Sequence, residues 1–228
     1  MMLLLLLCQQ DADTLLKQLE AKLVKAKTLQ VEIKGETSFT KGGKKATASM
    51  AGVIKAKAPA KYSFIGTMSQ GEQKIEANLV SDGATVKETA GDKTRTMTPV
   101  KDFSERAGAL FSRFGFVPAQ VLGLRNEDLD PQVEGADFLP DARKLVTIEA
   151  AKAAVDGGVT TITGTAVYRR YAETSDTKVA FTLVLGADGF PAKRTLKHVM
   201  EAITVEVVET YSNWKLDADI ADDEFKVK

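Results

Sequence analysis

Residues 50–68 read MAGVIKAKAPAKYSFIGTM, and the two-residue period of this stretch decides the fold class. Before Pro59, one face of an extended chain carries Met50, Gly52, Ile54 and Ala56. After Pro59, one face carries Tyr62, Phe64, Gly66 and Met68. Apolar residues at every second position are typical of strands that bury one face, and proline is tolerated at the join between strands. The stretch therefore predicts two antiparallel strands joined near Pro59.

The same period continues on both sides of this pair. Upstream, Val31 and Ile33 alternate with charged residues, and the Gly42, Gly43 pair predicts a turn. Downstream, Ile75, Ala77 and Leu79 share a face, and two shorter strands are expected near residues 84–89 and 93–98. Together these segments predict an antiparallel meander with one apolar face and one charged face.

Three helical segments are expected beside the strands. Residues 13–27 follow the acidic Asp11, end in several lysines and place leucines on one side, which suits the helix dipole and the helical period. Residues 103–114 place Phe103, Leu110, Phe111 and Phe114 on one stripe, and Pro118 begins a shorter helical piece. Residues 125–142 are expected to form a loop.

A second run of strands is expected near residues 144–155, 159–170, 177–186, 190–199 and 202–213. The segment from Glu149 to Ala154 is rich in alanine and could also be helical. Strand runs separated by helices favour an α+β fold, namely one strongly curved antiparallel sheet whose helices cover the concave face. Because no Gly/Ser-rich linker divides the chain, residues 11–228 are expected to form one domain.

The first ten residues have the character of an export signal. Leu3 to Leu7 form an apolar run that ends at Cys8, which is followed by polar residues, as in a bacterial lipoprotein signal. Leu6 and Leu7 stand where such a signal has small residues, and no Lys or Arg precedes the run. Lipidation of Cys8 with membrane contact, and an inert apolar tail, are both consistent with this pattern.

Composition excludes several classes of function. Thirty-one basic and 31 acidic side chains give zero formal net charge, whereas nucleic-acid binders have a basic excess. With one Cys and one His, the chain has few metal ligands and catalytic nucleophiles, so we expect no enzyme, metal site or cofactor. The acidic clusters at residues 127–130 and 222–224 lack the pattern of a calcium loop and are expected to be solvated.

Four segments in order resemble the LolA/LolB family of periplasmic lipoprotein carriers. They are residues 52–59 (GVIKAKAP), residues 79–83 (LVSDG), residues 188–191 (DGFP), and residues 211–214 (YSNW) with residues 222–225 (DDEF). The resemblance covers roughly residues 12–228 and implies an open half-barrel of about eleven strands closed by lid helices. The carrier proper has an arginine before the early proline that ties down the lid, whereas this chain has Ala58 there and Lys57 next to it.

The resemblance implies a non-enzymatic binder or carrier of lipid or lipoprotein acyl chains, exported to the periplasm or anchored at the outer membrane. The expected apolar cavity is lined by Ile54, Phe64, Leu79, Met97, Phe103, Leu110, Phe111 and Phe114. Two alternatives remain open: these residues simply fill a core, or the fold serves as a protein-interaction or envelope-sensor module with no lipid cargo. In the sensor alternative, the groove would receive an envelope protein.

Overall fold

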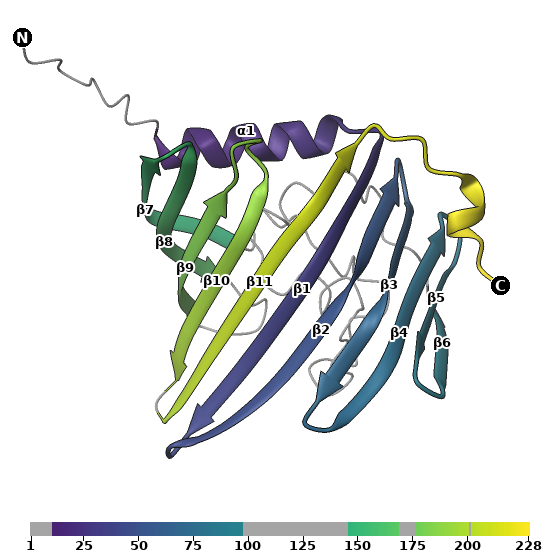
Figure 1. The fold of residues 1–228 in the computed structure, drawn as a ribbon, viewed down its shortest axis with the longest axis horizontal. Coiled ribbons are helices and arrows are strands. Elements are labelled where there is room, and N and C mark those ends of the chain that lie inside the picture. The colour runs from purple at the N-terminus through teal and green to yellow at the C-terminus, as the bar shows by residue number, and fades with distance from the viewer. Residues whose placement is uncertain (1–10, 98–145, 169–176, 201) are drawn as a thin grey trace, which may run out of the picture.

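A computed structural model describes residues 11–97, 146–168, 177–200 and 202–228. Within these ranges the chain forms one antiparallel sheet of eleven strands and one α-helix (Figure 1). The helix is α1 (Ala12–Lys25), and a short 3-10 helix, η1 (Asp222–Phe225), lies near the C-terminus. The first strands are β1 (Thr28–Lys41), β2 (Lys44–Lys57), β3 (Lys61–Gln70), β4 (Gln73–Asp82), β5 (Val86–Ala90) and β6 (Lys93–Met97). The later strands are β7 (Val146–Asp156), β8 (Val159–Tyr168), β9 (Thr177–Leu185), β10 (Pro191–Met200) and β11 (Ile203–Leu216).

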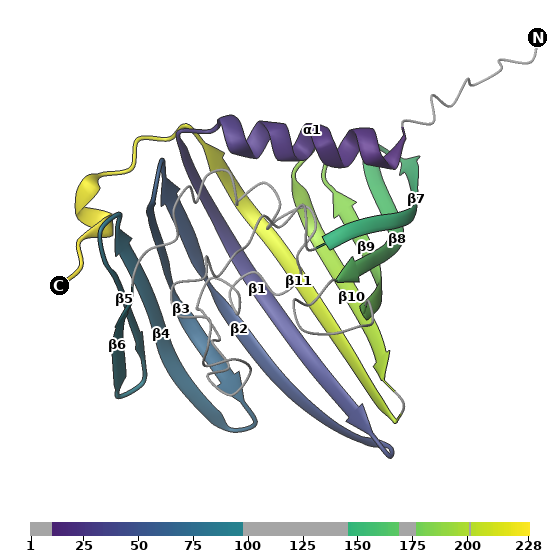
Figure 2. The same cartoon turned by 180° about the vertical axis from the view of Figure 1, so that it is seen from behind.

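The sheet consists of two meanders joined along β1 and β11. Its strand order is β6-β5-β4-β3-β2-β1-β11-β10-β9-β8-β7, so each neighbouring pair except β1 and β11 is consecutive in the sequence. The sheet is curved, and β7 runs at a steep angle to β11 where it sweeps across the view in Figure 2. The prediction that both strand runs belong to one antiparallel sheet is therefore confirmed. The expected helices at residues 103–114 and after Pro118, and the loop at 125–142, lie outside the described residues.

Local sequence accounts for the position of α1. The side chain of Asp11 accepts a hydrogen bond from the Thr14 amide at 3.4 Å, which satisfies a free N–H group at the start of the helix. Lys22 and Lys25 lie in the last turn, where positive charge suits the helix dipole. Buried leucines on one side join the core of the sheet, and α1 runs across one end of the strands (Figure 1). The expected N-terminal helix is confirmed, although it ends at Lys25, two residues before the predicted end.

The strand register divides the sheet into two faces. Val31 pairs with Ile54, Ile54 with Phe64, and Phe64 with Leu79, so these buried side chains share one face, which we call the inner face. The opposite, outer face carries exposed charged residues such as Lys34 and Glu36 on β1. The alternation seen in the sequence therefore marks the two faces correctly.

Two strands contain irregularities that the sequence pattern did not indicate. The alanine-rich segment at residues 149–154 is a strand, as expected, and the helical alternative is wrong; it contains a register shift between Glu149 and Lys152 and a positive φ of 51° at Ala150. β11 extends to Leu216, beyond the predicted end near residue 213. Asn213 adopts a φ of 54° opposite a register shift in β1, which indicates a bulge that bends the strand without ending it.

The C-terminal segment folds back over the outer face at β2, β3 and β4. Phe225 is buried, and η1 contacts β3 and β4. The Asp222 carboxylate forms ion pairs with the ammonium groups of Lys57 at 2.7 Å and Lys61 at 3.1 Å. The Glu224 carboxylate forms a third ion pair, with Lys55 at 2.9 Å. The acidic cluster at residues 222–224 is exposed to solvent, as expected, and two of its carboxylates also attach the segment to lysines of the sheet. Lys57, the basic residue beside Ala58, takes part in this attachment through its ion pair with Asp222.

This attachment is expected to weaken in acid. Hydrogen bonds from Lys57 and then Lys61 hold the pKa of Asp222 below its ordinary value, so the attached state favours the ionised carboxylate. The ionised Asp222 carboxylate therefore stabilises the attached segment at pH values above the ordinary pKa of a free aspartate. This stabilisation is lost as the pH falls through the lowered pKa of Asp222 in the folded protein. We expect the Phe225 amide resonance to shift during titration to about pH 2, before the sheet unfolds.

The Asp222→Asn variant should show the detached resonance at neutral pH. The matched control is Asp223→Asn, because the Asp223 carboxylate pairs with Lys226 of the same segment and not with the sheet. In this variant the Phe225 resonance should shift with pH as it does in the wild-type protein. Identical titrations of the Asp222→Asn variant and the wild-type protein would contradict the assigned role of Asp222.

Candidate functional site

The inner face brings together three of the residues predicted from the sequence to line a cavity. Ile54 on β2, Phe64 on β3 and Leu79 on β4 are directly paired neighbours, and all three are buried. Met97 is the last residue of β6 and pairs with Val86, but its side chain lies outside the description. The remaining predicted residues are also outside the described ranges: Cys8, Phe103, Leu110, Phe111 and Phe114.

Glycines shape the inner face beneath Phe64. Gly52 and Gly66 are paired across β2 and β3, and the ring of Phe64 lies over both. A Cβ atom at Gly52 would meet the Cε2 atom of Phe64 at 2.6 Å, and one at Gly66 would meet its Cζ atom at 2.7 Å. No side chain larger than hydrogen is compatible with this ring position, so the two glycines let the aromatic ring lie flat on the sheet.

The other half of the sheet repeats this arrangement. Gly164 on β8 pairs with Phe181 on β9, and a Cβ atom at Gly164 would meet the Cε1 atom of Phe181 at 2.7 Å. Each half of the inner face therefore carries one buried phenylalanine ring seated on glycine backbone. Met50 and Met68 pair with each other in the next inner-face row beyond Gly52 and Gly66. Their flexible thioether side chains adapt readily to differently shaped neighbours.

The inner face is closed at one end and exposed at the other. The helix α1 runs across the first end, where its leucines are buried against the sheet (Figures 1 and 2). Near the opposite hairpins, Phe39 is 45% exposed and Ile75 is 41% exposed, although both lie on the inner face. Apolar surface thus reaches solvent at the end of the sheet remote from α1.

A buried charged cluster lies in the middle of the inner face. Arg194 on β10 and Glu209 on β11 are paired, and they are 1% and 0% exposed. The Nε and Nη2 groups of Arg194 donate to one Glu209 carboxylate oxygen at 3.0 and 2.7 Å. The Tyr211 hydroxyl donates to the same oxygen at 2.6 Å and accepts from Arg194 at 2.6 Å. These three residues, the Arg194–Glu209–Tyr211 cluster, hold two opposite charges within an otherwise apolar face.

Burial and the neighbouring charges act on the protonation of the Tyr211 hydroxyl. Burial raises the pKa of the Tyr211 hydroxyl well above its ordinary value; the positive charge of Arg194 opposes the rise and the negative charge of Glu209 adds to it. The phenol therefore stays protonated and remains a hydrogen-bond donor to Glu209 across the physiological range. Such a network is rigid because each member fixes the orientation of the others.

This cluster is not among the site residues predicted above, although the sequence carries a signal for it. Arg194 has the same strand parity as the buried Leu196, and Glu209 has the same parity as Val207 and the buried Tyr211. Charged residues in phase with the apolar positions of two neighbouring strands predict an inward-facing ion pair.

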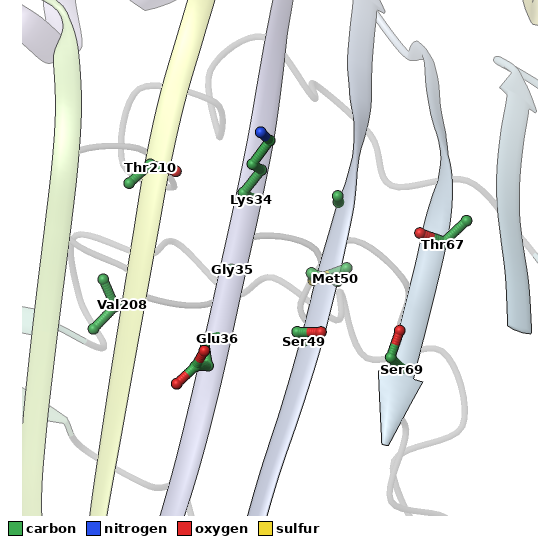
Figure 3. Close-up of a pocket in the computed structure, with 10 residues that line it drawn as sticks. Lys34, Gly35, Glu36, Ser49, Met50, Thr67, Ser69, Val208 and Thr210 are labelled. Carbon is green, nitrogen blue, oxygen red and sulfur yellow. The ribbon is translucent and has the colours of Figure 1, made fainter. Parts of the chain in front are cut away.

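A second surface feature is a hollow on the outer face. Its volume is about 390 Å³, and it extends over β11, β1, β2 and β3 (Figure 3). The lining residues are Lys34, Gly35, Glu36, Ser49, Met50, Ala51, Thr67, Ser69, Val208 and Thr210. The lining combines four hydroxyl side chains and one residue of each charge with the apolar Met50, Ala51 and Val208, so the hollow has a mixed character.

The described residues show neither a metal centre nor a membrane-spanning helix. Within residues 11–97, 146–168, 177–200 and 202–228, no group of three or more His, Cys, Asp or Glu side chains lies close enough to hold a metal ion. The imidazole of His198 makes a 3.1 Å hydrogen-bond contact with the Lys178 carbonyl oxygen. In the same part of the chain, no helix has both the length and the apolar character needed to cross a bilayer.

Comparison with known proteins finds similarity among solved structures only. No family model and no curated protein matches the chain. LprF from Mycobacterium bovis aligns over 92% of this chain and 94% of its own, with 12% identity and a TM-score of 0.38. A LolA superfamily protein from Nitrosomonas europaea aligns over 95% and 97%, with 12% identity and a TM-score of 0.35.

A third match is the MucA/MucB complex of Pseudomonas aeruginosa, with 12% identity and a TM-score of 0.35. It covers 96% of this chain, which spans 61% of the matched chain. The LolA-like resemblance drawn from the sequence motifs is thus also found among solved structures.

Proposed function

We propose that this protein is a non-enzymatic binder of lipid or lipoprotein acyl chains, which it holds against the inner face of its sheet. The observation that carries the proposal is the continuity of apolar surface along β2, β3 and β4. This surface runs from the buried Ile54, Phe64 and Leu79 to the solvent-exposed Ile75. A single molecule that is apolar and long fits such a surface better than a compact polar substrate does.

Energetics support an acyl chain as the occupant. Each methylene group moved from water to an apolar surface contributes about 0.8 kcal/mol, so a partly buried chain is held reversibly. The partly buried Met68 offers adaptable contact area beside this surface. The apolar run before Cys8 supports placing this binder in the bacterial cell envelope, with Cys8 as a candidate lipid anchor.

Binding of N-phenyl-1-naphthylamine, an apolar dye that fluoresces in apolar surroundings, tests this proposal on the full chain. We expect the wild-type protein to bind the dye and lauric acid to displace it. The Phe39→Asp variant places a charge at the exposed end of the inner face and should weaken dye binding about tenfold, because a carboxylate there resists desolvation.

The matched control is Ile65→Asp, since Ile65 is 49% exposed but lies on the outer face of β3. Both replacements introduce the same charge at a similarly exposed apolar residue, so only the face differs. We expect the Ile65→Asp variant to bind the dye as the wild-type protein does. If the wild-type protein fails to bind the dye, or if both variants lose affinity equally, the inner face is not the acyl-binding surface. The protein-interaction alternative would then be favoured.

A further inference from the structure

The hydroxyl group of Thr37 is buried and has no hydrogen-bond partner in the part of the chain that the structure describes. Thr37 lies on β1 with its side chain on the inner face and is 7% exposed. Among the described residues, its Oγ1 atom has no hydrogen-bond partner. A buried hydroxyl that loses its water and gains no partner costs about 1–3 kcal/mol, so native proteins rarely retain one without a reason.

The position of Thr37 relates this hydroxyl to the charged cluster. Thr37 pairs with Val207 on β11, and Glu209 is the next inner-face residue along that strand. Such diagonal neighbours lie about 7–8 Å apart, too far for a direct hydrogen bond but close enough for one bound group to approach both. Gly35, which pairs with Glu209 and precedes Thr37 on the same face, contributes no side chain between them.

We propose that Thr37 and the neighbouring Arg194–Glu209–Tyr211 cluster form the polar end of the acyl-binding surface, with the Thr37 hydroxyl donating to the carbonyl oxygen of a neutral acyl ester. This inference rests on the proposed function and narrows its ligand class. The carbonyl group of a bound ester would be held beside Thr37 on β1, while its acyl chain lies along the apolar surface.

Charge balance selects a neutral group over a carboxylate. The positive charge of Arg194 already faces the negative charge of Glu209 within hydrogen-bonding distance. A ligand carboxylate brought into this buried region would add a charge beside that pair, and an uncompensated buried charge is strongly unfavourable. An ester carbonyl needs only the hydroxyl donor that Thr37 supplies.

Competition between two uncharged compounds of similar length tests the inference. Methyl laurate and dodecane are each used to displace N-phenyl-1-naphthylamine from the full chain. We expect Thr37→Val, which keeps the side-chain shape and removes the hydroxyl, to weaken methyl laurate binding about three- to tenfold. Dodecane binding should not change, and Thr37→Ser should retain the preference for the ester.

The control is Ser63→Ala, because Ser63 Oγ is the other described side-chain atom that is buried without a partner and it lies on the outer face of β3. This variant should bind both compounds as the wild-type protein does. The urea midpoint of the Thr37→Val variant should equal or exceed that of the wild-type protein, since no protein hydrogen bond is lost. If both compounds bind and Thr37→Val affects them equally, the inference is overturned while acyl binding stands. Failure of the dye to bind the wild-type protein overturns both.

Discussion

Replacing Glu209 with alanine is expected to lower the free energy of unfolding by about 3–5 kcal/mol, because the replacement leaves the guanidinium of Arg194 buried without its carboxylate. Arg194 is 1% exposed, so water cannot replace the two donated hydrogen bonds. The Tyr211 hydroxyl would also lose its acceptor. Urea unfolding of the full chain at neutral pH measures this loss.

Two further variants test whether the loss of stability comes from leaving a buried charge unpaired or from any replacement on this strand. Glu206→Ala removes an exposed carboxylate from the same strand and should change the free energy of unfolding by less than about 0.5 kcal/mol. The double variant Arg194→Met with Glu209→Leu removes both charges and should be much more stable than Glu209→Ala alone, since well-packed apolar residues can replace a buried ion pair at little cost. A double variant as unstable as the single one would show that the ion pair is not the source of the loss.

Truncating Phe64 to alanine is expected to cost about 3–5 kcal/mol of stability. The ring is fully buried, lies over Gly52 and Gly66, and is flanked by Ile54 and Leu79. Glycine backbone cannot move up to fill the space that the ring leaves, so the cavity persists and adds to the lost transfer free energy. Thermal or urea unfolding, monitored by circular dichroism, measures the change.

The adjacent residue provides the control for this truncation. Ile65 follows Phe64 on β3 but is 49% exposed on the outer face, so Ile65→Ala should cost less than about 1 kcal/mol. A loss of stability below about 1 kcal/mol for Phe64→Ala would mean that the ring borders open space, into which neighbouring side chains can move when the ring is removed. In that case the apolar inner face around Phe64 would be a preformed cavity and not a packed core.

Much of this fold could be predicted from the sequence because the sheet alternates cleanly between its faces. Ile54, Phe64 and Leu79 have the same parity on three consecutive strands, and tight turns fix the register between them. Asp11 marks the start of the helix in the same local way. Signals of this kind require only neighbouring residues, so a single sequence carries them in full.

Features that depend on distant pairing were harder to predict. Nothing near Gly52 in the sequence indicates that a phenylalanine ring lies on it, because the paired strand determines which ring is there. The bulge at Asn213 depends on its partner strand in the same way and leads to an early predicted end for β11. The Arg194–Glu209 pair joins two strands whose surface-like composition conceals two inward positions.

The joint between β1 and β11 has a consequence for how the protein is made. β1 follows α1 directly, while its partner on one side is the last strand of the chain, with Leu29 opposite Leu216. A nascent chain therefore exposes the free edge of β1, with its unpaired amide and carbonyl groups, until β11 has been synthesised. Contacts so distant in sequence also slow the search for the native state. In the cell, the half-finished sheet needs protection from pairing with other chains until its final strand arrives.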